Sequence, residues 1–178
     1  MKRIVSAIVA TLALVVSAAP SQAAGITAVR TRNFYATQSS PYGSLWMTFF
    51  QVTDLTGQQP ETVTGCVDVR IGPAQDSGCG PMTVTFDPLN QAGTITATVQ
   101  GAAGPIVADL TYLTTRAGSN LPYADAEVVP TPPQSATVFT EVSRNGRANG
   151  TITTAFGPMG VVNASAGIVD SIIVSATI

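Results

Sequence analysis

Asp125 and Glu127 are the two residues whose type and spacing come nearest to a catalytic pair. They lie two positions apart, so an extended backbone would place both carboxylates on one face. Carboxylates about 5 to 10 Å apart carry out glycoside hydrolysis in many enzymes. These two residues are therefore the catalytic candidates of one alternative function, a carboxylate-based enzyme acting on carbohydrate.

Other acidic residues have positions that suggest separate roles. Asp68, Asp109 and Asp170 interrupt strands, so any of them that turns inward should be checked for a raised pKa. Asp76 and Asp87 could offer oxygens to calcium, but their surroundings lack the ligand density of a calcium loop. We therefore expect no metal site.

The composition removes several classes of enzyme. The sequence contains no histidine, and its only lysine is Lys2. Without imidazole there is no Ser-His-Asp triad, Cys-His pair or histidine metal site. Without a lysine in the mature chain there is no Schiff-base chemistry and no nucleotide-binding P-loop. We expect a non-catalytic protein without a cofactor.

Aromatic rings can stack on the apolar faces of sugars, and three of them could face a ligand: Tyr42, Trp46 and Tyr123. Trp46 and Phe50 alternate with Met47 and Phe49 along one run. In a strand these pairs would lie on opposite faces, so at least one face is expected to be core.

The N-terminus has the three parts of a secretory signal. Lys2 and Arg3 precede an apolar run that ends at Val16, and small residues precede a cleavage point after Ala23. We therefore expect a signal peptide over residues 1–23 and a single secreted domain over residues 24–178. The apolar run is shorter than the roughly 20 residues of a membrane span, and no later segment is a better candidate.

Cys66 and Cys79 are the only cysteines, and two cysteines in an exported chain indicate a disulfide. Bridged cysteines need Cα atoms within about 7 Å of each other. The turn at Gly72 and Pro73 should therefore bring residues 74–79 back beside residues 67–71. Residues 82–86 should then occupy a position outside that hairpin.

Alternation of apolar and polar residues predicts an all-β protein, an antiparallel β-sandwich or partly open barrel of about nine strands. Several of these strands have threonine on the outer face. The expected strands are 26–37, 43–53, 67–71, 82–86, 94–99, 105–114, 136–144, 149–156 and 167–177.

Turn signals give two further expectations. The pair Asn145 and Gly146 favours a type I′ hairpin. The four prolines between residues 118 and 133 predict a long crossover between two sheets. Two sequons, at Asn149 and Asn163, could carry glycans in a suitable host.

Charge and assembly limit the partners. Removal of the signal leaves six basic residues against ten acidic ones, which argues against nucleic acid. The remaining partners are a carbohydrate or a protein at the cell surface. A chain rich in Ala, Thr and Gly with one disulfide resembles pilins in composition, although its cysteines are closer together. Its last run, 167–178, is apolar on both faces, so it is either a central strand or one donated to another subunit.

Overall fold

A computed structural model describes residues 25–87, 89–115, 123–129 and 135–177, and these residues form an all-β antiparallel fold. Its nine strands are β1 (Ile26–Ser40), β2 (Gly43–Asp54), β3 (Thr62–Ile71), β4 (Ala74–Phe86), β5 (Ala92–Gln100), β6 (Pro105–Thr114), β7 (Tyr123–Val129), β8 (Ser135–Thr154) and β9 (Gly157–Thr177). The predicted signal peptide lies outside the described residues. No helix among the described residues is long and apolar enough to cross a membrane.

Eight of the strands close into a ring. The hydrogen-bonded order is β6-β5-β4-β3-β2-β1-β9-β8-β7, and an additional pairing joins β6 to β8. That pairing closes a barrel and leaves β7 outside it. Closure satisfies the backbone groups that an open sheet would leave unpaired at its edges.

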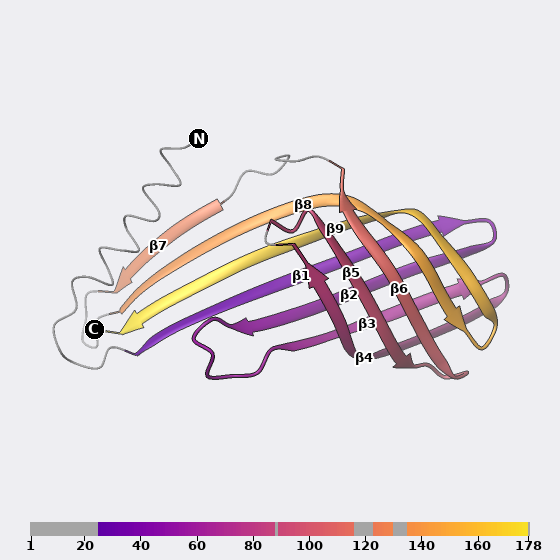
Figure 1. Cartoon of the computed structure of the whole chain (residues 1–178), viewed down its shortest axis with the longest axis horizontal. Coiled ribbons are helices and arrows are strands. Elements are labelled where there is room, and N and C mark those ends of the chain that lie inside the picture. The colour runs from indigo at the N-terminus through magenta and orange to yellow at the C-terminus, as the bar shows by residue number, and fades with distance from the viewer. Residues whose placement is uncertain (1–24, 88, 116–122, 130–134, 178) are drawn as a thin grey trace.

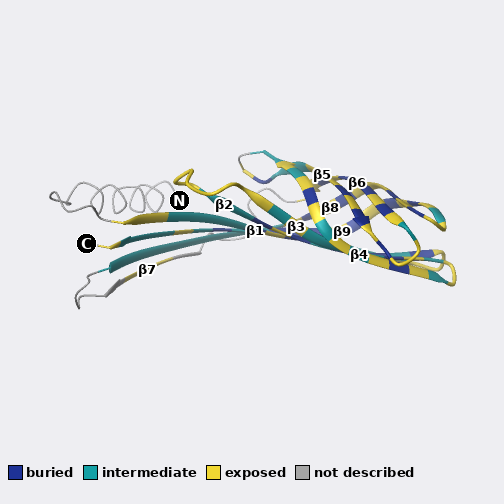
Figure 2. Ribbon diagram, turned by 90° about the horizontal axis from the view of Figure 1, so that it is seen from below, coloured by how far each residue is buried: buried dark blue, intermediate teal, exposed yellow. Residues whose placement is uncertain are grey.

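The barrel interior contains the core. Alternate residues along each strand point inward, and the largest fully buried ones include Tyr112, Leu45, Met47 and Ile95. Figure 2 shows this alternation as bands of buried and exposed residues on the barrel. Four rings pack together at one end of the interior: Phe34, Phe49, Phe86 and Tyr112.

Beyond that end, four strands continue as an open sheet, which we call the extension. It comprises residues 26–31 of β1, 123–129 of β7, 135–142 of β8 and 171–177 of β9. Figure 1 shows β8 and β9 running the length of the molecule from the extension into the barrel. None of the buried hydrophobic residues in the described chain lies in the extension.

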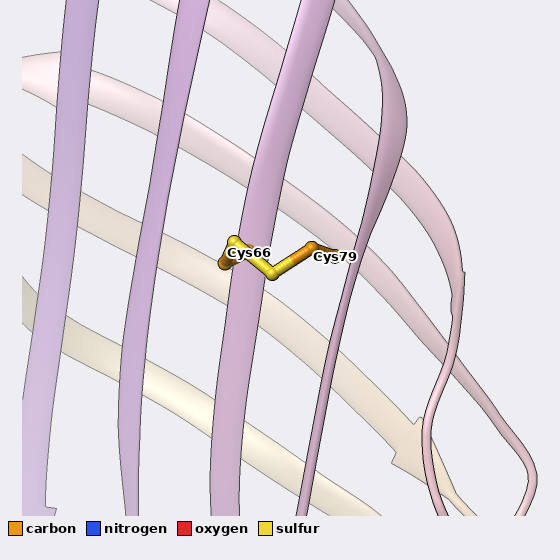
Figure 3. The surroundings of a disulfide bond; sticks show 2 residues. All are labelled: Cys66 and Cys79. Atoms are coloured by element: carbon orange, nitrogen blue, oxygen red, sulfur yellow. A yellow bond between two sulfur atoms is a disulfide. The ribbon is translucent and has the colours of Figure 1, made fainter.

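The disulfide prediction is confirmed. Cys66 lies directly opposite Cys79 in the β3–β4 hairpin, with Cα atoms 4.1 Å apart (Figure 3). The β3–β4 pairing covers residues 74–81 of β4, whereas residues 82–86 pair with β5. The change of partner follows Pro81, which has no backbone N–H to donate to a ladder.

The predicted hairpin at Asn145 and Gly146 is wrong, because both residues lie inside the continuous strand β8. Gly146 has a different purpose: a Cβ there would lie 2.4 Å from the Leu113 carbonyl oxygen and 2.5 Å from the Tyr112 ring. The glycine allows β6 and β8 to approach closely. The predicted strands 136–144 and 149–156 are therefore one strand.

The actual turn between β8 and β9 follows Thr154. Its hydroxyl accepts a hydrogen bond from the backbone N–H of Phe156, and Gly157 has a positive φ of 111°. The second Asn-Gly pair, Asn149 and Gly150, lies at a register shift between β8 and β9. Gly150 is needed there because a Cβ would lie 2.0 Å from the Asp109 carbonyl oxygen.

The predicted strandless crossover is also wrong in part. Residues 123–129 form β7, which pairs with residues 135–141 of β8. The rest of the proline-rich segment lies outside the described residues. The prediction divided β8 into two strands and omitted β7. These two errors offset each other, so the observed total of nine strands equals the predicted one.

Candidate functional site

The β1–β2 hairpin sets which side chains reach the outer surface of the barrel. The Ser40 hydroxyl accepts hydrogen bonds from the backbone N–H groups of Tyr42 and Gly43. This short turn fixes a register in which Tyr35 lies opposite Thr48. A shift of one residue would exchange the inner and outer faces of β2, so the turn determines the surface that β2 presents.

A shallow hollow lies on the outer wall across β1, β2, β3 and β4. We call it the aromatic hollow, and the side chains that define it are Asn33, Tyr35, Thr48, Phe50, Thr64 and the Cys66–Cys79 disulfide. Its volume is about 710 Å³, and no charged side chain lines it. Phe50 is 43% exposed and Tyr35 is 39% exposed, so both rings are accessible beside it.

Tyr35 is held in place by its neighbours. Its ring covers Gly167 of β9, where a Cβ would lie 2.6 Å from the ring. Its hydroxyl donates a hydrogen bond of 3.2 Å to the side-chain oxygen of Asn145 on β8. A ring fixed at both its face and its hydroxyl loses little conformational entropy when a ligand binds.

The three aromatics predicted to face a ligand have different positions. Trp46 is 48% exposed on the outer face of β2, two residues from Thr48 in the aromatic hollow. Tyr42 is 85% exposed in the turn between β1 and β2. Tyr123 begins β7, and its side chain lies outside the described residues. The expectation that one face of this run is core is confirmed, because Met47 and Phe49 are buried.

Asp125 and Glu127 occupy positions on one face of β7, as their spacing indicated. Both are exposed. Neither lines the aromatic hollow or either of two smaller hollows, one between β4, β5 and β6 and one between β3 and β4. Each of those hollows has at most one carboxylate in its lining, Asp87 in one and Glu61 in another.

The two acids considered for calcium bind the backbone instead. The buried carboxylate of Asp76 accepts hydrogen bonds from the backbone N–H groups of Ser77, Ala102 and Ala103. Asp87 accepts one from Gln91. These carboxylates stabilise the β5–β6 and β4–β5 turns. The described residues contain no group of three or more potential metal ligands.

Of the three strand aspartates, Asp170 turns inward. It forms a bidentate ion pair with Arg30 and accepts a hydrogen bond from Asn90. Burial by itself would raise the pKa of Asp170, but the hydrogen bonds from Arg30 and Asn90 and the nearby charges lower it below its usual value. The pKa of the one inward strand aspartate is therefore lowered rather than raised. Asp109 is exposed, and Asp68 accepts hydrogen bonds from Gln75 on the outer face.

Arg32 lies beside this ion pair. It donates a hydrogen bond to Gln51 and lies over the Phe86 ring, 5.8 Å from its centroid. Burial lowers the pKa of Arg32, and the positive charge of Arg30 lowers it further. We call Arg30, Arg32, Arg144 and Asp170 the polar belt, because on the inward face they lie where the aromatic end of the core meets the extension.

Sequence reasoning missed both the aromatic hollow and the polar belt. The hollow joins residues of β1, β2, β3 and β4 with Val169 of β9, and the belt joins β1 to β8 and β9 near the other end of the chain. The one local signal was Asp170 within an apolar run, which marked an inward polar residue but not its partners.

The geometry defines an all-β barrel with an uncharged aromatic hollow on its outer wall and a charged belt at one end of its core. No protein-family model and no curated protein sequence matches this chain.

Proposed function

We propose that this chain is a secreted, non-catalytic β-barrel protein that binds carbohydrate at the cell surface through the aromatic hollow. One observation carries the proposal: the Tyr35 ring is held in place over Gly167 beside the exposed Phe50 ring. Flat rings stack on the apolar faces of sugars, and the polar Asn33, Thr48 and Thr64 can form hydrogen bonds with hydroxyl groups.

The lining favours an uncharged sugar. No arginine or carboxylate lines the aromatic hollow. Asp68 lies opposite Trp46 on the outer face and already accepts hydrogen bonds from Gln75. A neutral polysaccharide would therefore meet no buried unpaired charge on binding.

Two other functions have less support. For a carboxylate enzyme, Asp125 and Glu127 would need a cleft, and they are exposed on β7. For a pilin-like assembly through a donated last strand, β9 would need a free edge, and it pairs with β1 on one side and β8 on the other.

The proposal can be tested through Trp46, the only tryptophan of the chain. The purified protein is titrated with soluble neutral polysaccharides, including a β-glucan, a mannan and chitin oligosaccharides, while its emission is recorded. We expect a saturable change with at least one of them, and we expect Tyr35→Ala and Phe50→Ala each to weaken it about tenfold or more.

The matched control is Phe156→Ala, an exposed ring in the turn between β8 and β9. This variant should bind as the unmodified protein does. Binding that survives both Tyr35→Ala and Phe50→Ala would exclude the aromatic hollow as the site. Hydrolysis of any of these polymers that Asp125→Ala or Glu127→Ala abolishes would show an enzyme instead.

A further inference from the structure

One face of the extension continues the inner surface of the barrel. On β9 the inward series runs from Ile168 through Asp170 to Ile172, Val174 and Ala176, and β1 and β8 follow it in register. We call this the inner face of the extension, and its apolar members are Ile26, Ala28, Ala136, Val138, Val142, Ile172, Val174 and Ala176. None of them is fully buried, and Ile26 is 44% exposed. The other seven are half-buried. A contiguous apolar surface that stays partly open to solvent is typical of a binding site.

The polar belt lies at the inner end of this face and contains more positive than negative charge. Asp170 is its one carboxylate, and Arg30, Arg32 and Arg144 are its three guanidinium groups. Arg30 binds both oxygens of Asp170, and Asn90 donates to one of them. This carboxylate is therefore already committed, and Arg32 Nε lies 3.9 Å from it.

Two belt donors lack acceptors. Among the described residues, Arg32 Nε and Arg144 Nε are buried and donate to no acceptor. Arg32 is 9% exposed. A buried guanidinium without a full set of partners is unfavourable, and an anion placed beside it would be stabilised. The lowered pKa of Arg32 agrees with incomplete compensation of its charge.

We propose that the inner face of the extension binds a long-chain fatty acid, with its carboxylate at Arg32 and Arg144 and its chain along the apolar rows. Ala176 lies six positions after Asp170 on β9, which corresponds to about 20 Å of strand. This length accommodates an extended acyl chain. The guanidinium groups at one end match a negatively charged head group, and the apolar rows match a single hydrocarbon chain. The site is separate from the aromatic hollow, which lies on the outer wall.

The first experiment measures binding of cis-parinaric acid, a fatty acid whose fluorescence rises in apolar surroundings. We expect saturable binding to the purified protein, and a fatty alcohol should compete far less well than a fatty acid of equal length. Arg144→Gln should weaken binding about tenfold or more, since a charged hydrogen bond is lost. The matched control is Arg147→Gln, an exposed arginine on the outer face of the same strand, which should leave binding unchanged.

A second pair of variants tests the acyl part of the site. Val174→Asn places an amide on the inner face of the extension, and Ile173→Asn places one on the opposite face. We expect Val174→Asn alone to weaken binding of cis-parinaric acid. Circular dichroism spectra of all four variants should match that of the unmodified protein, so that lost binding reflects the site.

Four results would overturn the proposal. One is the absence of saturable cis-parinaric acid binding. Another is equal competition by the fatty acid and the fatty alcohol. A third is binding that Arg144→Gln and Val174→Asn both leave intact. The fourth is binding to phosphatidylglycerol vesicles without binding of the monomeric fatty acid, which would indicate a membrane surface as the partner.

Discussion

The barrel and the extension are built from the same strands but differ in how they are stabilised. β1, β8 and β9 run through both regions and keep the same alternation of faces. In the barrel, the β6–β8 pairing closes the sheet around a core. In the extension, β8 pairs with β7 instead, and neither face is covered by another layer of the described chain. The pairing partner of β8 thus decides whether the same alternation produces a buried core or an accessible surface.

Substitution of Phe34, in the barrel core, should change the stability of the protein more than the other substitutions that test this comparison. Phe34 is 2% exposed and packs against Phe49 with ring centroids 5.1 Å apart. We expect Phe34→Ala to lower the free energy of unfolding by about 3–5 kcal/mol, because it leaves a cavity among the rings. Urea denaturation followed by circular dichroism measures this change. A loss below about 1 kcal/mol would show that the barrel core is not the main source of stability.

Loss of the disulfide should have the next largest effect. Cys66 and Cys79 are 13 residues apart and close a small loop within the barrel. We expect Cys66→Ser with Cys79→Ser to lower the free energy of unfolding by about 3 kcal/mol, mainly through greater freedom of the unfolded chain. The same denaturation experiment under non-reducing conditions measures it. Unchanged stability would contradict this interpretation.

Asp170 lies where the barrel meets the extension, and its contribution to stability can be measured by acidification. Its pKa is lowered on folding, so its contribution to stability is complete above the unfolded-state pKa near 3.8. The contribution is lost as the pH falls through the lower pKa of the folded state. Below about pH 4, the free energy of unfolding of the unmodified protein should therefore decrease as the pH falls. Asp170→Asn should remove the part of this slope that corresponds to the uptake of at most about one proton on unfolding.

The control for this experiment is Asp109→Asn, which alters an exposed carboxylate on the outer face of β6. It should keep the acid dependence of the unmodified protein. If both variants show the same slope as the unmodified protein, Asp170 does not link acidification to unfolding.

The smallest effect should come from the extension itself. Ile173 is 39% exposed on the face opposite the inner face of the extension. We expect Ile173→Thr to change the free energy of unfolding by no more than about 0.5 kcal/mol. Hydrogen exchange should also show faster exchange for amides of residues 171–177 than for those of β2 and β3. Equal protection in the two regions would contradict the comparison.

The sequence predicted the features that short-range chemistry controls. A bridge between Cys66 and Cys79 requires the two residues to lie close together. This requirement predicted that residues 74–79 return beside β3, as they do. Alternation found β5 except for its first two residues and its last one, since the strand has one face toward the core and one toward water. The predicted strand 105–114 has the bounds of β6.

The errors arose where one local signal has two physical meanings. Asn145 and Gly146 favour a turn, yet the same glycine also permits the close approach of β6. Prolines between residues 118 and 133 argued against a strand, yet the seven residues of β7 contain none and pair with β8. Only the tertiary structure distinguishes these alternatives.

The candidate sites could not be predicted because they depend on register across distant strands. Trp46 was predicted from its type as an aromatic that could face a ligand, and it is half exposed on the outer face. The position of Tyr35 over Gly167 required the pairing of β1 with β9, which brings together residues more than 130 positions apart. Nothing in the local pattern around either residue indicates that contact.

The great length of the β8–β9 hairpin has a mechanical consequence. Both strands pass from the outer tip of the molecule to the far end of the barrel (Figure 1). Tension applied at that tip would run parallel to the strands, so many interstrand hydrogen bonds would have to break together rather than one after another. A molecule tethered by its open end would therefore resist pulling along this axis far better than pulling across it.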